Sequence, residues 1–194
     1  MGRAIALIRQ FQAGQRQYFR LARQEVAARN LLLVRALSLT TAGLLLILLC
    51  ISPFLISGWS PTLNHLLLLP ASLLVWALAE LYARRGQPTS LGVTMMCLLF
   101  EAVLFVLIIL IDVIPTPDAP GTFMPLLCVV LPSMFVFPLS LSYGVVAVFE
   151  VIYILAVLAF KNDFIGQYDI FDSIVGIIFS LALSLVIARL RVRD

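Results

Sequence analysis

Long apolar runs recur along the chain, and short segments rich in Pro, Gly, Ser, Asn or charged residues separate them. A transmembrane helix needs about 20 mainly apolar residues. We therefore predict six transmembrane helices, at residues 34–57, 64–83, 91–111, 122–138, 142–160 and 170–189. The fourth contains Pro125 and Pro132 and ends at Pro138, so we expect it to be bent, because proline removes a hydrogen bond from a helix.

The segment before the first apolar run has a different pattern. Apolar residues recur at helical spacing, and a single acid, Glu25, stands among six arginines: Arg3, Arg9, Arg16, Arg20, Arg23 and Arg29. This pattern is typical of an amphipathic helix that lies on an anionic inner leaflet. A helix packed against the bundle or against a dimer partner would show the same pattern. We expect no nucleic-acid binding, since no DNA-reading motif accompanies the arginines.

The charges between the apolar runs predict the orientation. Arginines flank the first run, the second connection (Arg84 and Arg85) and the end of the last run, whereas Asp112, Asp118, Asp163, Asp169 and Asp172 lie in other connections, with Lys161. The positive-inside rule therefore places both termini in the cytoplasm, which agrees with an even number of spans. We divide the chain into a cytoplasmic or interfacial amphipathic helix (1–33), a six-helix bundle (34–189) and the start of a cytoplasmic output helix (190–194).

Composition agrees with an all-α membrane protein. The chain of 194 residues is 62% hydrophobic and only 12% charged, whereas a soluble domain carries about 25% charged residues. A transmembrane barrel is excluded because its strands would alternate in polarity. The cysteines Cys50, Cys97 and Cys128 all fall inside apolar runs, so we expect free thiols.

Two carboxylic acids lie deep in the predicted bilayer, Glu101 in the third span and Glu150 in the fifth. A charged acid there costs about 2.5–3.5 kcal/mol, so both should face the bundle interior. No Lys or Arg lies at a comparable depth. The acids are therefore protonated, share a proton or a metal ion, or contact a cationic ligand. The alternative is that each protonated glutamate is simply hydrogen-bonded to a neighbouring helix.

Several aromatic residues accompany these acids. Tyr143 and Tyr153 share a helix face with Glu150, and Phe105 shares one with Glu101. The second span carries His65, Ser72, Trp76 and Glu80 in one column. His65 could sense outside pH or contact a ligand, or it could anchor the helix at the interface. The candidate ligand-binding residues are Glu101, Glu150, Tyr143, Tyr153, Phe105, Trp76 and His65.

The last span carries a stripe of small residues spaced by four, Gly176, Ser180, Ser184 and Ala188. Such a stripe lets another helix approach closely. The partner is either a neighbouring span or the same span of a second protomer. Motifs of zinc proteases, of serine hydrolases and of phosphate-binding loops do not occur in the sequence. We expect no catalytic residue, no cofactor and no metal site.

The layout of the chain resembles the N-terminal membrane sensor modules of bacterial diguanylate cyclases of the GGDEF type. The residues that carry the resemblance are the runs Glu25-Val26-Ala27-Ala28-Arg29-Asn30 into Arg35, Tyr168-Asp169-Ile170-Phe171-Asp172-Ser173-Ile174-Val175-Gly176, and Ala188-Arg189-Leu190-Arg191-Val192-Arg193. The resemblance implies a multi-pass protein of the bacterial inner membrane, in a homodimer, whose last span regulates a cytoplasmic diguanylate cyclase and hence cyclic di-GMP. The cyclase signature does not occur in these residues, so no cyclase residues are carried over.

Two other functions fit the same pattern. Six spans with both ends inside resemble the substrate-binding subunits of energy-coupling-factor vitamin transporters, in which case the glutamates and aromatics would hold a small molecule. A purely structural membrane partner is the third hypothesis, and there the glutamates would contribute to stability alone.

Overall fold

The computed structural model describes residues 2–55, 63–86, 89–121 and 123–193. The regular elements of this part are helical: α1 (Gly2–Leu21), α2 (Arg23–Leu55), α3 (Leu63–Arg84), α4 (Ser90–Ile108), the π-helical turn η1 (Ile109–Val113), α5 (Phe123–Met134), α6 (Leu139–Phe160) and α7 (Asp163–Arg193). The predicted first connection, at residues 57–61, lies outside the described residues. Within the described part, five helices are long and apolar enough to cross a membrane: α2, α3, α4 with η1, α6 and α7. The chain is therefore an all-α, multi-pass membrane protein.

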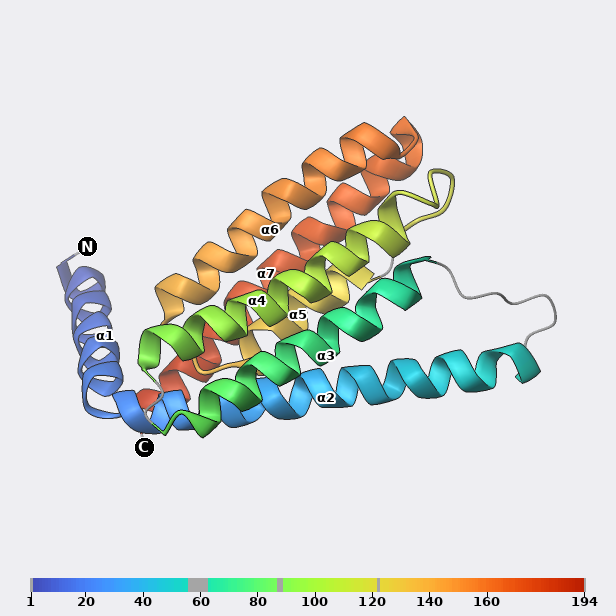
Figure 1. Ribbon diagram of the computed structural model, residues 1–194. Helices are drawn as coiled ribbons and strands as arrows, with labels where there is room; N and C mark the ends of the chain where they lie inside the picture. Colours follow the sequence, from blue (N-terminus) through green and yellow to red (C-terminus); the bar gives the residue numbers. More distant parts are fainter. Residues whose placement is uncertain (1, 56–62, 87–88, 122, 194) are drawn as a thin grey trace.

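The long helices run side by side in alternating directions, and both termini lie at one end of the bundle (Figure 1). We call this end the basic end, because the arginines of α1, of the α3–α4 turn and of the last turns of α7 lie there. The acidic end, opposite, holds η1, the start of α5 and the turn between α6 and α7. α2 packs against α3 and α4, whereas α7 packs against α5 and α6.

The predicted N-terminal helix of residues 1–33 is divided in the structure. α1 ends at Leu21 and α2 begins at Arg23, so residues 23–33 belong to the same helix as the first span. The helical hydrogen bonds continue through the bend, since the Ala22 N–H donates to the Tyr18 carbonyl over 2.8 Å and the Val26 N–H donates to the Ala22 carbonyl over 2.8 Å. α1 then contacts the last turns of α7, which corresponds to the alternative of a helix packed against the bundle.

The prediction that the fourth span, residues 122–138, is one bent helix is wrong. α5 covers only Phe123–Met134, and residues 135–138 are not helical. A helix of 12 residues is about 18 Å long, which is less than the thickness of the hydrocarbon core. Pro138 disfavours helical backbone in the residue before it, and it serves instead as the N-cap of α6, with φ −58° and ψ 143°. The bend expected from the prolines is therefore a break in the helix.

Asn30 of α2 holds this non-helical segment in place. Its Nδ2 donates to the Val136 carbonyl over 3.0 Å, and its Oδ1 accepts from the Val136 N–H over 2.8 Å. Both residues are buried. Backbone without helical hydrogen bonds is tolerated at membrane depth only where protein supplies the missing partners. The paired amide thus allows residues 135–138 to run inside the bundle.

Two apolar clusters fill the interior. The first joins α2, α3 and α4 to the segment after α5, and it includes Val34, Val75, Cys97, Phe100 and Phe135. The second joins α4, α5 and α6, and it includes Phe105, Met124, Cys128, Tyr153 and Val157. The rings of Phe100 and Phe135 meet edge to face at 6.2 Å. As expected from the sequence, the cysteines are free, although Cys50 is exposed at the surface of α2.

Gly176 is the point of closest approach between α7 and α5. A Cβ atom added at Gly176 would lie 3.0 Å from the Cα of Pro125 and 3.3 Å from its carbonyl oxygen. Both atoms belong to the backbone, so they cannot move aside as a flexible side chain would. Gly144 of α6 is a contrasting case, because an added Cβ there meets no atom within 4 Å.

We predict opposite effects for alanine at these two glycines. Gly176→Ala should destabilise the bundle by about 1–3 kcal/mol, because it overpacks the α5–α7 contact. Gly144→Ala should stabilise it by about 0.5–1 kcal/mol, because alanine favours a helix interior. Unfolding in sodium dodecyl sulfate, followed by far-ultraviolet circular dichroism, measures both. Equal stability of the two variants would contradict the close approach.

Candidate functional site

Lys161 is the C-cap residue of α6, and its side chain lies inside the acidic end of the bundle. Its ammonium group donates to the Ala119 carbonyl over 2.5 Å and lies 3.4 Å from the Thr116 hydroxyl. It also lies 3.3 Å from Oδ2 of Asp169, and both side chains of this ion pair are fully buried. A buried charge of this kind persists only where it is paired and hydrogen-bonded. The pair therefore joins the loop after η1 to α7.

Two aspartates satisfy the backbone where α5 begins. Oδ1 of Asp169 accepts from the Gly121 N–H over 2.8 Å, and Oδ2 of Asp112 accepts from the Phe123 N–H over 3.0 Å. The first N–H groups of a helix have no partner within the helix and carry partial positive charge. Carboxylates are the side chains that match them best. Asp112 comes from η1 and Asp169 from α7, so both elements fix the start of α5.

Gly121 lies where three oxygen atoms converge. A Cβ at this residue would be 2.9 Å from Oδ2 of Asp112, 2.9 Å from the Tyr153 hydroxyl and 3.2 Å from Oδ2 of Asp169. Any other residue at this position would push into this cluster. We name Asp112, Gly121, Tyr153, Lys161 and Asp169 the acidic-end cluster.

Glu150 lies about one helical turn from this cluster, toward the middle of α6. Its Oε1 accepts from the Ser173 hydroxyl over 2.6 Å. The Ser173 hydroxyl also lies 2.9 Å from the Ile170 carbonyl. Glu150 is 5% exposed and Ser173 is fully buried. This contact joins α6 to α7 and confirms that Glu150 faces the bundle interior.

The same face of α7 continues to the basic end. Gly176, Ser180, Ser184 and Ala188 are all buried within the protomer. The Ala188 carbonyl accepts from Nε2 of Gln15 in α1 over 2.8 Å. The stripe predicted from the sequence thus packs against α5 and α1, which is the alternative of a neighbouring helix.

Tyr143 lies near the basic end of α6, apart from Glu150 and Tyr153. Its hydroxyl donates to the Leu181 carbonyl of α7 over 3.1 Å. Ten residues of helix separate it from Tyr153, which corresponds to about 15 Å along the axis. The three residues share a side of α6, as expected, but they occupy different sites along it.

Glu101 is buried in α4 on the same face as Phe105, as the sequence predicted, and Cys97 and Ile108 are buried on this face as well. The Phe105 ring stacks on the Phe149 ring of α6, with 4.3 Å between the ring centroids and an angle of 3° between the ring planes. Oε2 of Glu101 has no hydrogen-bond partner among the described residues. Within the same residues, no hydrogen bond joins Glu101 to Glu150. The two acids thus have separate surroundings.

His65 and Trp76 lie on α3, which packs against α2 and α4. Both side chains are half-buried. Glu80 of the same helix forms ion pairs with Arg35 of α2 and, over 3.1 Å, with Arg84. The structure therefore divides the predicted ligand-binding residues among α3, α4 and two parts of α6, and it brings Glu150 and Tyr153 closest to other buried polar groups.

From the sequence, Lys161, Asp112 and Asp169 were predicted to be loop charges that indicate orientation, and none was predicted to be a site residue. In the structure all three are buried, at 8%, 7% and 1% exposure. One signal was present in the sequence, since Asp169, Ser173 and Gly176 follow one another at spacings of four and three, which places them on the helix face of the small-residue stripe. The backbone groups that Lys161 and Asp169 contact, at Ala119 and Gly121, lie more than 40 positions away along the chain, and no local pattern identifies them.

The charged residues of the acidic-end cluster hold neighbouring segments together by an ion pair and by hydrogen bonds to the backbone. Within the described residues, no three His, Cys, Asp or Glu side chains could hold a metal ion together. The ammonium group and the two carboxylates hold backbone groups and each other. A change in the charge of any of them would therefore alter the contacts among η1, α5 and α7.

Comparisons of this chain with protein-family models, with curated proteins and with solved structures found no match.

We predict that Lys161 and Asp169 are energetically coupled. Lys161→Gln and Asp169→Asn should each lower the free energy of unfolding by about 3–5 kcal/mol, because each leaves a buried charge without its partner. The double variant should lose less than the sum, with a coupling energy of about 0.5–3 kcal/mol. Detergent unfolding of the four proteins measures this cycle.

The matched control is Asp172→Asn on the exposed side of α7. It should change stability by less than about 0.5 kcal/mol. Strictly additive losses in the cycle would show that the two side chains do not depend on each other.

Proposed function

We propose that this chain is a signal-transducing module of a multi-pass membrane protein, and that α7 carries the signal from the acidic end to the basic end. One observation carries the proposal. A single face of α7 makes buried polar contacts with other elements at both ends, to Lys161 and Gly121 at one end and to Gln15 at the other. A change at the acidic end would therefore reach the basic end through one rigid element.

The mechanism requires two arrangements of α7 relative to its neighbours. Small-residue contacts such as Gly176 on Pro125 bring the backbones of α7 and α5 close together, so a small shift of α7 changes its contact with α5. A ligand or a membrane state that favours one arrangement shifts the population toward it. The output that we propose is a dimeric cytoplasmic domain beyond α7, and the resemblance noted from the sequence suggests a diguanylate cyclase in a bacterial inner membrane.

The proposed topology has six crossings with both termini in the cytoplasm. α5 and the segment 135–138 would make the fourth crossing together, as a short helix followed by non-helical chain. The charge asymmetry between the basic and acidic ends supports this orientation.

A second candidate is a subunit that binds a small molecule for transport. The observation that favours it is the broken fourth crossing, because discontinuous helices form the substrate sites of many transporters. In that case Glu101 and Glu150 would face the substrate.

The topology is tested by cysteine labelling in intact cells. In a chain whose native cysteines are replaced by alanine, Asp118→Cys should react with a membrane-impermeant thiol reagent. Ser140→Cys and Arg85→Cys should react only after lysis, because they lie at the basic end. Labelling of both Asp118→Cys and Ser140→Cys from outside would contradict a fourth crossing.

The signalling role is tested by fusing residues 1–194 to an output domain that is active only as a particular dimer. Ser173→Ala and Ser180→Ala change the buried face of α7. They should alter the output by roughly twofold to thirtyfold at equal expression, which corresponds to a coupling change of about 0.5–2 kcal/mol.

Asp172→Asn is the control here as well, since it changes a polar residue on the exposed side of α7. An output that ignores every substitution on the buried face would refute the signalling role. Uptake of a small molecule that is lost with Glu101→Gln or Glu150→Gln would favour the transport role instead.

A further inference from the structure

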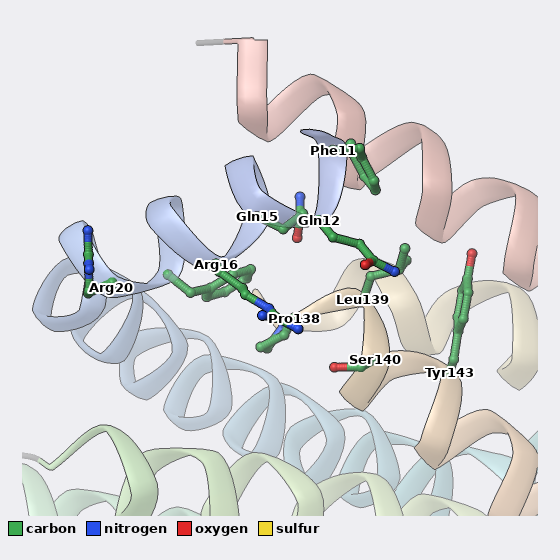
Figure 2. A pocket seen from close by; sticks show the side chains of 10 residues that line it. Phe11, Gln12, Gln15, Arg16, Arg20, Pro138, Leu139, Ser140 and Tyr143 are labelled. Atoms are coloured by element: carbon green, nitrogen blue, oxygen red, sulfur yellow. The ribbon is translucent and has the colours of Figure 1, made fainter. Parts of the chain in front are cut away.

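A hollow of about 610 Å³ lies between α1 and the start of α6, at the basic end. We call it the α1–α6 hollow. Half-buried apolar and aromatic side chains form part of its lining, namely Phe11, Phe19, Leu139 and Tyr143. Figure 2 shows Gln12 and Arg16 extending from α1 toward Leu139 and Pro138, with Tyr143 farther along α6. The hollow is thus open to a ligand with an apolar part.

The polar side of the hollow is positively charged. Arg16 and Arg20 line it, and both are exposed. They also line a second, adjoining hollow of about 460 Å³, together with Arg9. The three arginines occur at spacings of seven and four, which places them on one face of α1. None of the described residues that line either hollow is acidic.

We propose that the α1–α6 hollow binds an anionic phospholipid, with its phosphate on Arg16, with Arg20 adding positive charge nearby, and with an acyl chain against Phe11, Phe19 and Leu139. Charge complementarity selects this occupant: the described lining carries two arginines and no carboxylate, and arginine binds a phosphate through paired hydrogen bonds. The apolar lining matches an acyl chain and does not suit a free phosphate ion.

The site adjoins the contact between α1 and α7. Gln15, which donates to the Ala188 carbonyl, belongs to the same α1 segment and also lines the hollow. A lipid in the hollow would therefore hold α1 and α6 together beside the last turns of α7. Binding of the lipid does not depend on the signalling role proposed above, so an experiment that contradicts one proposal leaves the other unchanged.

The experiment is a titration of the whole chain in a neutral detergent, where no charged bilayer surface is present. Native mass spectrometry counts bound phosphatidylglycerol or phosphatidylcholine. We expect a one-to-one complex with phosphatidylglycerol at a Kd about tenfold or more below that for phosphatidylcholine. The double variant Arg16→Gln, Arg20→Gln should weaken phosphatidylglycerol binding by about 25-fold, from about fivefold for each arginine.

Two further variants separate charge from shape. Arg23→Gln removes an exposed arginine that does not line the hollow, and it should change the Kd by less than about twofold. Ser140→Phe fills the hollow from the exposed start of α6 and leaves every charge in place. It should weaken phospholipid binding by about tenfold, and circular dichroism checks that each variant keeps its helix content.

Three outcomes would overturn the proposal. The first is equal binding of the two lipids by the native chain. The second is an equal loss in Arg23→Gln and in the double variant, which would indicate attraction by overall charge alone. The third is displacement of the lipid by excess inorganic phosphate, with Ser140→Phe unaffected, which would mean that the hollow is a site for a free anion.

Discussion

At both ends of α5, buried polar side chains supply the hydrogen-bond partners that the backbone needs. Asp112 and Asp169 accept from the N–H groups at the start of α5, and Asn30 pairs with Val136 in the segment after it. Lys161 donates to the carbonyl of Ala119. The hydrocarbon core offers no water to replace these partners. The broken path between α4 and α6 therefore depends on four polar residues: Asp112 within it, and Asn30, Lys161 and Asp169 from other parts of the chain.

α7 is the element on which most of these contacts meet. It carries Asp169 and Ser173 toward the acidic end and the small residues from Gly176 to Ala188 toward the basic end. Polar atoms on this face contact α6, the loop before α5 and α1. A helix held in this way moves as a unit, since displacement at one end strains contacts at the other. This is the physical basis for assigning it the role of transmitter.

The two ends of the bundle differ in how their charges are placed. At the acidic end Lys161 and Asp169 are paired and buried, so these charges neutralise each other inside the protein. At the basic end Glu80 binds Arg35 and Arg84, but the arginines of α1 are exposed beside a hollow. The first arrangement stabilises the fold, whereas the second leaves positive charge available to an anionic surface or lipid.

The hydrophobic pattern by itself determined the class of protein and the position of the long helices, because the cost of exposing backbone and charge to lipid leaves few alternatives. It likewise placed Glu101 and Glu150 inside, where the structure finds both. Tertiary structure alone decided that α5 stops at Met134, since Pro138 is compatible with a kink or a break until Asn30 supplies partners for the freed backbone. It also decided that Lys161 and Asp169 are buried, because a charge near the end of an apolar run is assigned to the surface unless its partner is known. The two residues are close in the sequence, but the backbone groups they contact, at Ala119 and Gly121, lie more than 40 positions away, and only the packing of the helices brings them together.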